Sequence, residues 1–283
     1  MAETLGVARS NLIERLAGRR RGRAPRYAIA DDERLLPMVR QICQGRASNG
    51  YRRVTAHLNR QLAASGERVN PKRIYRLMRQ DGLLLPRYTG QRPKRRHEGQ
   101  VITLKSNLRW CSDGFEIRCW NGEVVRVAFC LDCCDLEAMR FVATTGGISA
   151  EHVRDLLVES IEQRFGCIEK LPHPIEWLTD NGSCYTAEET VRFATSLGFI
   201  VCTTPVKSPQ SNGMAEAFVK TFKRDYVYLN DLPDAQTVMA KLPAWFEDYN
   251  EQHPHKGLKM RSPREYRRDR KSTRLNSSHK TES

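Results

Sequence analysis

The chain has 283 residues, 40% of them hydrophobic, and a formal net charge of +14, so it can bury the core of one large domain or two small ones. No apolar run approaches the roughly 20 residues of a membrane helix, and the N-terminus lacks the pattern of a signal peptide, which argues against a membrane or secreted protein. Nine scattered cysteines favour reduced thiols and a cytoplasmic location.

The charge is distributed unevenly along the chain. Residues 1–106 contain 24 basic and 8 acidic residues, residues 107–255 contain 13 and 22, and residues 256–283 contain 10 and 3. Basic segments can neutralise the phosphates of a nucleic acid, whereas an acidic middle segment needs another reason to approach a phosphate, such as bound cations. The alternative is that this asymmetry serves only solubility.

The first 30 residues are predicted to be a basic N-terminal arm. Residues 17–26 combine five arginines with Gly and Pro, as in a linker, and the preceding segment LGVARSNLIERL resembles the end of a helix-turn-helix unit. Because its earlier helix is missing, this unit is only partial.

Residues 31–86 are predicted to form a helix-turn-helix module that binds DNA. Asp31 and Asp32 can cap a first helix, Asn49–Gly50 marks a turn before a second, and Asn70–Pro71 begins a third. The third helix leaves a set of cations for its outer side: Lys72, Arg73, Arg76 and Arg79. The alternative is a small helical bundle with a solvated basic face. Residues 87–106 then form a basic linker in which Lys94, Arg95 and Arg96 can follow a DNA backbone.

Residues 107–268 have the pattern of an α/β domain. Three strand-like runs occupy residues 107–120, 122–134 and 136–147, and Asn121–Gly122 predicts a hairpin turn. The expected elements that follow are a helix at 150–166, a strand at 174–180, a helix at 186–198, a strand at 199–205, and helices at 211–228 and 234–251. This order predicts a mixed sheet flanked by helices. The polar residues 269–283 are expected to be a disordered tail.

Three acidic residues stand out by their context. Asp113 lies within the first strand among apolar residues, Asp180 ends the fourth strand before Asn-Gly, and Glu216 begins a helix that Ser211 or Asn212 can cap. If these carboxylates converge, they can hold two divalent ions for phosphodiester chemistry, and Mg²⁺ prefers such ligands. The spacing alone is a weak signal, so the prediction depends on the three contexts together.

Two lysines share a helical face with Glu216. Lys220 follows it by four positions and Lys223 by seven, so both can contact DNA phosphates beside the carboxylates. The alternative is a surface ion pair with Glu216.

The chain from about residue 31 to 268 resembles the transposase encoded by the second reading frame of a two-frame insertion sequence, an orfB-type product with a retroviral-integrase-like catalytic core. The resemblance rests on GYRRVTAHL, KRIYRLMRQDGLL, RWCSDGFEI, EWLTDNGSCY, SPQSNGMAEAFVKTFKRDY, YNEQHPH and SPREY. It implies a ribonuclease-H-like fold, an Asp-Asp-Glu triad at Asp113, Asp180 and Glu216, and Mg²⁺, or Mn²⁺ in its place, as cofactor.

The same resemblance implies strand cleavage at the ends of an insertion sequence and attack of a 3′-hydroxyl on target DNA, by a homo-oligomer in the bacterial cytoplasm at the nucleoid. An upstream-frame product can be a partner or the front of a fusion, because the first helix-turn-helix is incomplete. The segment after about residue 270 matches nothing in this family. Two rival functions are a DNA-binding regulator without catalysis and a nuclease that cuts without joining.

Three cysteines and two histidines are the candidate ligands of a zinc site. Cys130, Cys133 and Cys134 form CLDCC, with His253 and His255 as possible further ligands. Alternation along a strand would place the thiols on different faces, which favours buried thiols, so neither histidine is given a catalytic role.

Overall fold

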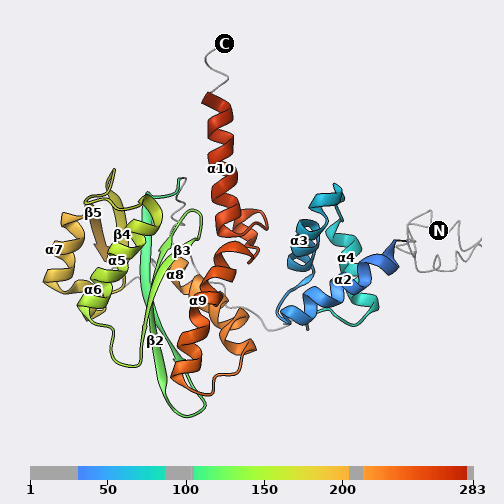
Figure 1. Ribbon diagram of the computed structural model, residues 1–283, viewed down its shortest axis with the longest axis horizontal. Coiled ribbons are helices and arrows are strands. Elements are labelled where there is room, and N and C mark those ends of the chain that lie inside the picture. Colours follow the sequence, from blue (N-terminus) through green and yellow to red (C-terminus); the bar gives the residue numbers. More distant parts are fainter. Residues whose placement is uncertain (1–30, 87–102, 104, 204–212, 279–283) are drawn as a thin grey trace, which may run out of the picture.

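The computed structural model describes residues 31–86, 103, 105–203 and 213–278. Within these ranges the chain forms a helical module, from α2 to α4, and a sheet domain, from β1 to α10 (Figure 1). The predictions for residues 1–30, for Lys94, Arg95 and Arg96, and for capping by Ser211 or Asn212 lie outside the described residues.

Three helices and a short 3-10 turn form the helical module: α2 (Asp32–Gly45), α3 (Tyr51–Gln61), η1 (Ala63–Ser65) and α4 (Pro71–Gln80). Their apolar faces meet in one core that includes Leu35, Leu58 and Met78. The predicted start of α4 is confirmed, because Asn70 Oδ1 accepts a hydrogen bond from the backbone N–H of Lys72 at 2.8 Å.

The predicted start of α2 differs in one respect. Asp31 stands at the N-cap position but makes no capping hydrogen bond. Instead Arg34 Nε donates to Asp31 Oδ1 at 2.6 Å, because a guanidinium three positions along the helix reaches back to its N-terminus. The cap expected from this side chain is therefore replaced by an ion pair.

The sheet domain is built on a five-stranded mixed sheet with the order β3-β2-β1-β4-β5. Its strands are β1 (Arg109–Arg118), β2 (Val124–Asp132), β3 (Ala138–Thr144), β4 (Ile175–Thr179) and β5 (Phe199–Thr203). The first three strands pair antiparallel, whereas β4 and β5 run parallel to β1. The predicted hairpin turn is present, since Asn121 Oδ1 accepts from Glu123 N and Gly122 has a φ of +90°.

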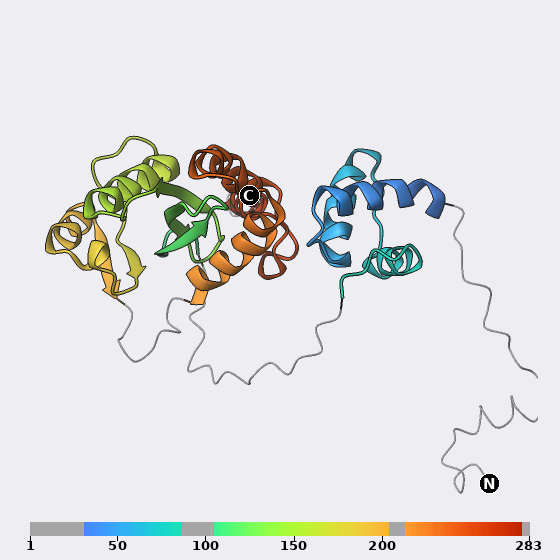
Figure 2. The same ribbon diagram turned by 90° about the horizontal axis from the view of Figure 1, so that it is seen from below.

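Helices cover both faces of this sheet (Figures 1 and 2). One face packs against α5 (Ala150–Phe165), α6 (Ser183–Thr186) and α7 (Glu188–Ser196), and the other against α8 (Gly213–Asp225) and α9 (Ala235–Glu251). Alternation along β1 directs Trp110 to the first face and Phe115 to the second. The mixed sheet flanked by helices, predicted from the order of elements, is thus observed.

The C-terminal segment differs from the expectation of a disordered tail. After η3 (Val227–Leu229) and η4 (Lys256–Leu258), α10 extends from Pro263 to Ser278, so much of residues 269–283 is helical. The first turns of α10 are anchored to the sheet domain, because Arg264 and Arg267 both pair with the buried carboxylate of Glu137. No proline or glycine follows Pro263 within the helix to end it.

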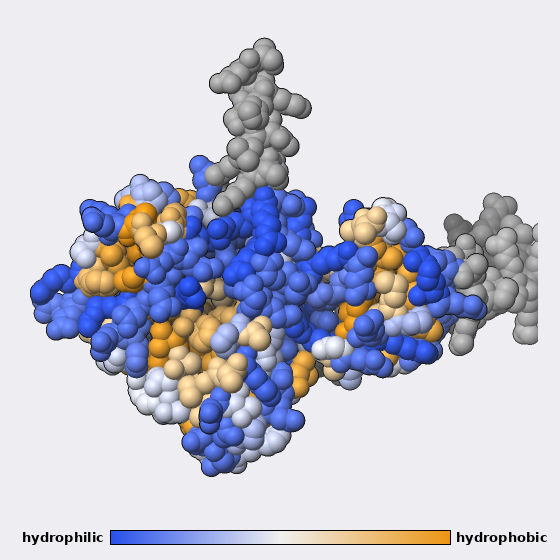
Figure 3. Space-filling model, in the orientation of Figure 1, coloured by the Kyte–Doolittle hydropathy of each residue, from blue (hydrophilic) through white to orange (hydrophobic). Residues whose placement is uncertain are grey.

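The face seen in Figure 1 is mainly hydrophilic, with apolar areas on the sheet domain and on the helical module (Figure 3). In the described part of the chain, none of the helices is both long and apolar enough to span a bilayer.

Candidate active site

Asp113 lies on β1, and Asp180 directly follows β4, the strand next to it. β1 is the central strand, and its parallel register with β4 pairs Cys111 with Leu178. Continuing that register by two residues aligns Asp113 with Asp180. Cys111 and Phe115 of β1 belong to the core under α8 and α9, so alternation places the Asp113 carboxylate on that same face.

The helix α8 brings Glu216 to this face. The ring of Phe218 packs 4.4 Å from that of Phe129, which is the β2 residue opposite Asp113 in the antiparallel register. Ala215, directly before Glu216, is fully buried. The first turn of α8 therefore lies over the part of the sheet that carries Asp113, and the three acids predicted from the sequence gather in one region.

The electrostatics of Asp113 reflect this proximity. Burial is the main cause that raises its pKa to about 6, the negative charges of Asp180 and Glu216 add to the rise, and a hydrogen bond from Gly114 N at 2.7 Å opposes it. The negative charges of Asp180 and Glu216 thus repel that of Asp113. A divalent ion between them would relieve this repulsion.

The turn after β4 controls the position of Asp180. Its Oδ1 accepts a hydrogen bond from Gly182 N at 3.0 Å. A Cβ atom added at Gly182 would lie 3.0 Å from this oxygen and 3.3 Å from Cδ2 of Tyr185, so an alanine here would press on the Asp180 side chain. The buried hydroxyl of Tyr185 has no hydrogen-bond partner among the described residues.

The donor set suits a hydrated Mg²⁺ ion. Across the described ranges, no three His, Cys, Asp or Glu side chains are arranged as a ready metal-binding group. Mg²⁺ does not need such a group, because it prefers carboxylate oxygens and keeps several of its waters. Asp113, Asp180 and Glu216 are therefore candidate ligands for such an ion.

The two lysines of α8 differ in their surroundings. The ammonium group of Lys220 lies 3.5 Å from Glu216 Oε2, which is the ion pair considered as an alternative for this residue. Lys223 is half-buried, and its ammonium group lies 5.7 Å from the ring centre of Phe115, two residues after Asp113. Of the two, Lys223 is directed at the strand that bears the candidate site.

The arginines predicted to face DNA from α4 also differ. Arg73 Nε donates to Asp32 Oδ1 at 2.7 Å and Arg76 pairs with the same carboxylate, so both brace α4 against α2. Arg79 is exposed and lines a groove of about 750 Å³ together with Lys72 and Tyr75. Tyr75 was not among the predicted site residues, although its spacing from Lys72 and Arg79 places these three side chains on one helical face.

The cysteine cluster is divided between the two faces of the sheet. Cys130 belongs to the core under α5 to α7, and Cys133 to the core under α8 and α9. Both thiols are buried, as the strand alternation predicted. The zinc alternative gains no support from this arrangement, because the two side chains do not share a face.

Comparison with known proteins places these features in a family. Residues 104–209 and 201–263 each match an Integrase core domain, and residues 30–92 match an HTH-like domain. The chain is 50% identical over 252 residues to transposase InsD for insertion element IS2A/D/F/H/I/K of Escherichia coli, covering 88% of this chain and 82% of the relative. Transposase InsD for insertion element IS2-9 of Escherichia coli strain K12 is also 50% identical, with 81% of its length covered.

Similar solved structures include the catalytic core domain of BIV integrase, with 21% identity, a TM-score of 0.39, and coverage of 62% of this chain and 99% of that one. Another is the HTLV-2 integrase catalytic core domain in complex with magnesium, with 18% identity, a TM-score of 0.41, and coverage of 54% and 93%. The predicted resemblance and the predicted fold class are confirmed by the family matches and the identity to InsD. The chain belongs to the family of insertion-element transposases with an integrase core domain.

Proposed function

We propose that this transposase cuts and joins DNA with a metal-dependent site formed by Asp113, Asp180 and Glu216. The observation that carries the proposal is the position of Asp113 on β1 beside β4, the strand that Asp180 directly follows, with α8 covering that face of β1. Burial first, and then the negative charges of Asp180 and Glu216, raise the pKa of Asp113 to about 6, and this nearby negative charge supports a role in cation binding.

The proposed reaction is an in-line displacement at phosphorus, first by water at an end of the element and then by a DNA 3′-hydroxyl on the target. Two Mg²⁺ ions, or Mn²⁺ in their place, would supply activation of the attacking oxygen and stabilisation of the leaving oxygen. The hydrogen bond from Gly182 orients Asp180, and Lys223 contributes positive charge where a phosphate approaches. No covalent intermediate with the protein is involved.

The proposal assigns separate tasks to the parts of the chain. Residues 1–30 and 87–106 would follow the DNA backbone, residues 31–86 would bind the ends of the element, and residues 107–268 would carry out catalysis. Target DNA, further copies of this chain and an upstream-frame product are the proposed partners, in the cytoplasm at the nucleoid. The charge pattern supports this division, because the basic residues are concentrated outside the catalytic segment.

The decisive test is the variant Asp113→Asn. We expect it to lose Mg²⁺-dependent cleavage of a DNA end while its affinity for that end stays within about twofold, because the site binds metal and not the bulk of the DNA. A matched control is Glu116→Gln, which alters an acid on the same strand that pairs with Arg126. Equal cleavage by Asp113→Asn and the control would remove this carboxylate from the mechanism.

A second assay separates joining from hydrolysis. Wild-type protein, a pre-cut DNA end and a target plasmid are incubated with Mg²⁺, and joined product is expected. Hydrolysis without joined product would instead assign the site to a nuclease.

A further inference from the structure

Two arginines of the helical module are inserted into the sheet domain. Arg46, at the end of α2, pairs with Asp248, donates to His253 Nδ1 at 3.1 Å and lies 4.6 Å from the ring centre of Tyr226. The Arg46 side chain is only 15% exposed to solvent. This contact joins α2 to the end of α9 and to the segment that follows α8.

Arg53, on α3, makes the second contact. Its Nη1 lies 2.9 Å from Asp225 Oδ2, and the Asp225 side chain is fully buried at the end of α8. Burial with an opposite charge makes such a pair costly to break, because either partner left alone would be an uncompensated buried charge. Together with Arg60, which donates to Gln252 O at 2.6 Å and pairs with Glu265, these contacts give the module a defined position on the sheet domain.

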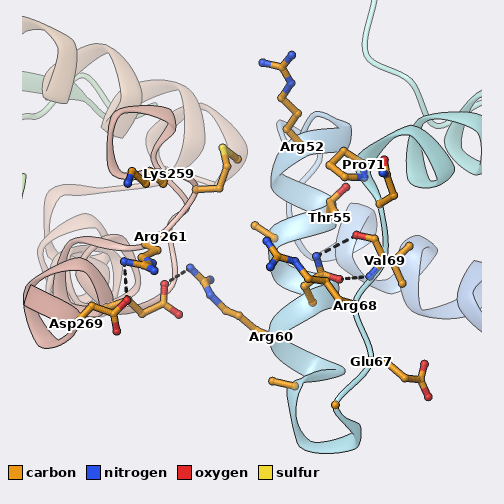
Figure 4. A pocket seen from close by; sticks show the side chains of 17 residues that line it. Arg52, Thr55, Arg60, Glu67, Arg68, Val69, Pro71, Lys259, Arg261 and Asp269 are labelled. Carbon is orange, nitrogen blue, oxygen red and sulfur yellow. Dashed lines mark hydrogen bonds and ion pairs between the residues drawn. The ribbon is translucent and has the colours of Figure 1, made fainter. Parts of the chain in front are cut away.

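This docked arrangement creates a cleft of about 970 Å³ between the two parts of the chain. In Figure 4 one wall carries Arg52, Arg60 and Arg68 from the module, and the other carries Lys259 and Arg261 from the sheet domain. The walls come from segments about 190 residues apart in the sequence, so the cleft exists only while the module is docked.

The acidic residues of the cleft are neutralised by partners. Glu67 pairs with Arg34, Glu265 with Arg60 at 2.5 Å, and Asp269 with Arg261 at 2.5 Å. Three lining cations have no acidic partner in the described part of the chain, and all three are exposed: Arg52, Arg68 and Lys259. The charge left over in the cleft is therefore positive and comes from both walls.

We propose that this cleft binds the phosphate backbone of duplex DNA, with Arg52, Arg68 and Lys259 as its phosphate contacts. Arginine and lysine on facing walls suit a polyanion that passes between them, and a DNA strand is such a polyanion. The adjoining α4 belongs to an HTH-like domain, so DNA bound by the module continues along the cleft. The inference rests on the proposed function only in taking DNA as the substrate.

The test compares the salt dependence of DNA binding by full-length variants. Asp113→Asn serves as the parent, because it removes cleavage from the measurement. Adding Arg52→Ala, Arg68→Ala and Lys259→Ala is expected to lower the slope of log K against log salt by about 2 to 3, since each phosphate contact contributes about 0.9. The loss should be equal for element ends and unrelated duplexes, because phosphate contacts carry no sequence information.

A matched control removes three exposed cations that do not line the cleft: Arg118, Lys170 and Arg192. A third variant, Arg46→Ala with Arg53→Ala, weakens the docking of the module to the contacts of Arg60 and leaves the three proposed phosphate contacts unaltered, so it should lower the slope, though by less than the cleft variant. Circular dichroism of each variant separates loss of contacts from loss of fold.

An unchanged slope in the cleft variant, or an equal fall in the control variant, would overturn the cleft proposal. Neither outcome bears on the catalytic proposal, which fails separately if Asp113→Asn cleaves DNA as well as the wild type.

Discussion

At the scale of single residues, the ionisation of Asp113 gives a measurable signature of the candidate site. Its pKa is about 6 in the folded chain, against an ordinary value of 3.8, so folding favours the protonated form. The metal-free protein should therefore lose stability as the pH rises from about 4 through about 6, by at most about 3 kcal/mol, because only the unfolded chain releases this proton easily.

Thermal unfolding in a chelator, measured from pH 4 to pH 8, tests this prediction. Asp113→Asn should not lose this stability as the pH rises, so at pH 8 it should be more stable than the wild type. Mg²⁺ should stabilise the wild type most above pH 6, where the carboxylate is ionised. Parallel pH profiles for the two proteins would contradict the assigned pKa.

Gly182 provides a second test at this scale. In Gly182→Ala the new Cβ would crowd Asp180 Oδ1 at 3.0 Å and the ring of Tyr185 at 3.3 Å. We expect cleavage to fall by about a hundredfold, because a small displacement of a positioned group is enough to do so. Gly147→Ala is the control, since nothing lies within 4 Å of its added Cβ. Wild-type cleavage by Gly182→Ala would show that the turn does not position Asp180.

At the scale of elements, α8 combines a packing face with a face that carries charge. Phe218 and Phe222 are buried against the sheet, and Lys223 extends over Phe115. Lys223→Ala should weaken binding to DNA ends by roughly 1–3 kcal/mol if its ammonium group contacts a phosphate. Lys220→Ala should weaken it less, because that ammonium group is paired with Glu216. Filter binding at several salt concentrations would show the difference, and unchanged affinity and slope for Lys223→Ala would discard the contact.

The hairpin between β2 and β3 depends on a buried ion-pair network. Arg164 of α5 lies 3.0 Å from Asp132, 2.8 Å from Asp135, and also pairs with Glu137, with all four side chains almost fully buried. In Arg164→Met the three acids would lose this partner, at a cost of about 3–5 kcal/mol.

The pH dependence of that loss has a defined sign. The pKa of Asp135 is about 6, raised first by burial and then by the charge of Asp132, while Arg164 lowers it. Without Arg164 the acids should bind protons more readily. The difference in free energy of unfolding between the variant and the wild type should therefore be smaller at pH 5 than at pH 8. Urea unfolding at both values tests this, with the exposed pair variant Arg192→Met as control, for which less than about 1 kcal/mol is expected.

At the scale of the whole molecule, the position of the helical module depends on few contacts. Arg46→Ala with Arg53→Ala removes the two buried pairs, yet Asp225 keeps Arg224 and Asp248 keeps the hydroxyl of Tyr226 as partners. The sheet domain should therefore stay folded while the module separates from it. Small-angle scattering should show a larger radius of gyration than for the wild type. An unchanged radius would mean that other contacts are enough to hold the module on the sheet domain. Arg34→Ala, within the module, is the control.

The local patterns in the sequence were sufficient for the elements, and they singled out the three candidate acids. Period-2 runs predicted the strands, Asn70–Pro71 predicted the start of α4, and the contexts of Asp113, Asp180 and Glu216 selected them among 33 acidic residues. Such features depend on neighbours a few positions away, which a sequence displays directly. The residues that form the cleft carry no comparable local pattern.

The sequence by itself therefore determined the family, the order of elements and the candidate triad, because each depends on short-range composition and spacing. Only the tertiary structure decided which cations pair with acidic side chains. Arg73 and Arg76 are paired with an aspartate more than 40 residues away, whereas Arg52 and Lys259, on opposite walls of the cleft, have no acidic partner within the part of the chain that the structure describes. Charge pairing over such separations depends on how the elements pack, and a helical period cannot reveal it.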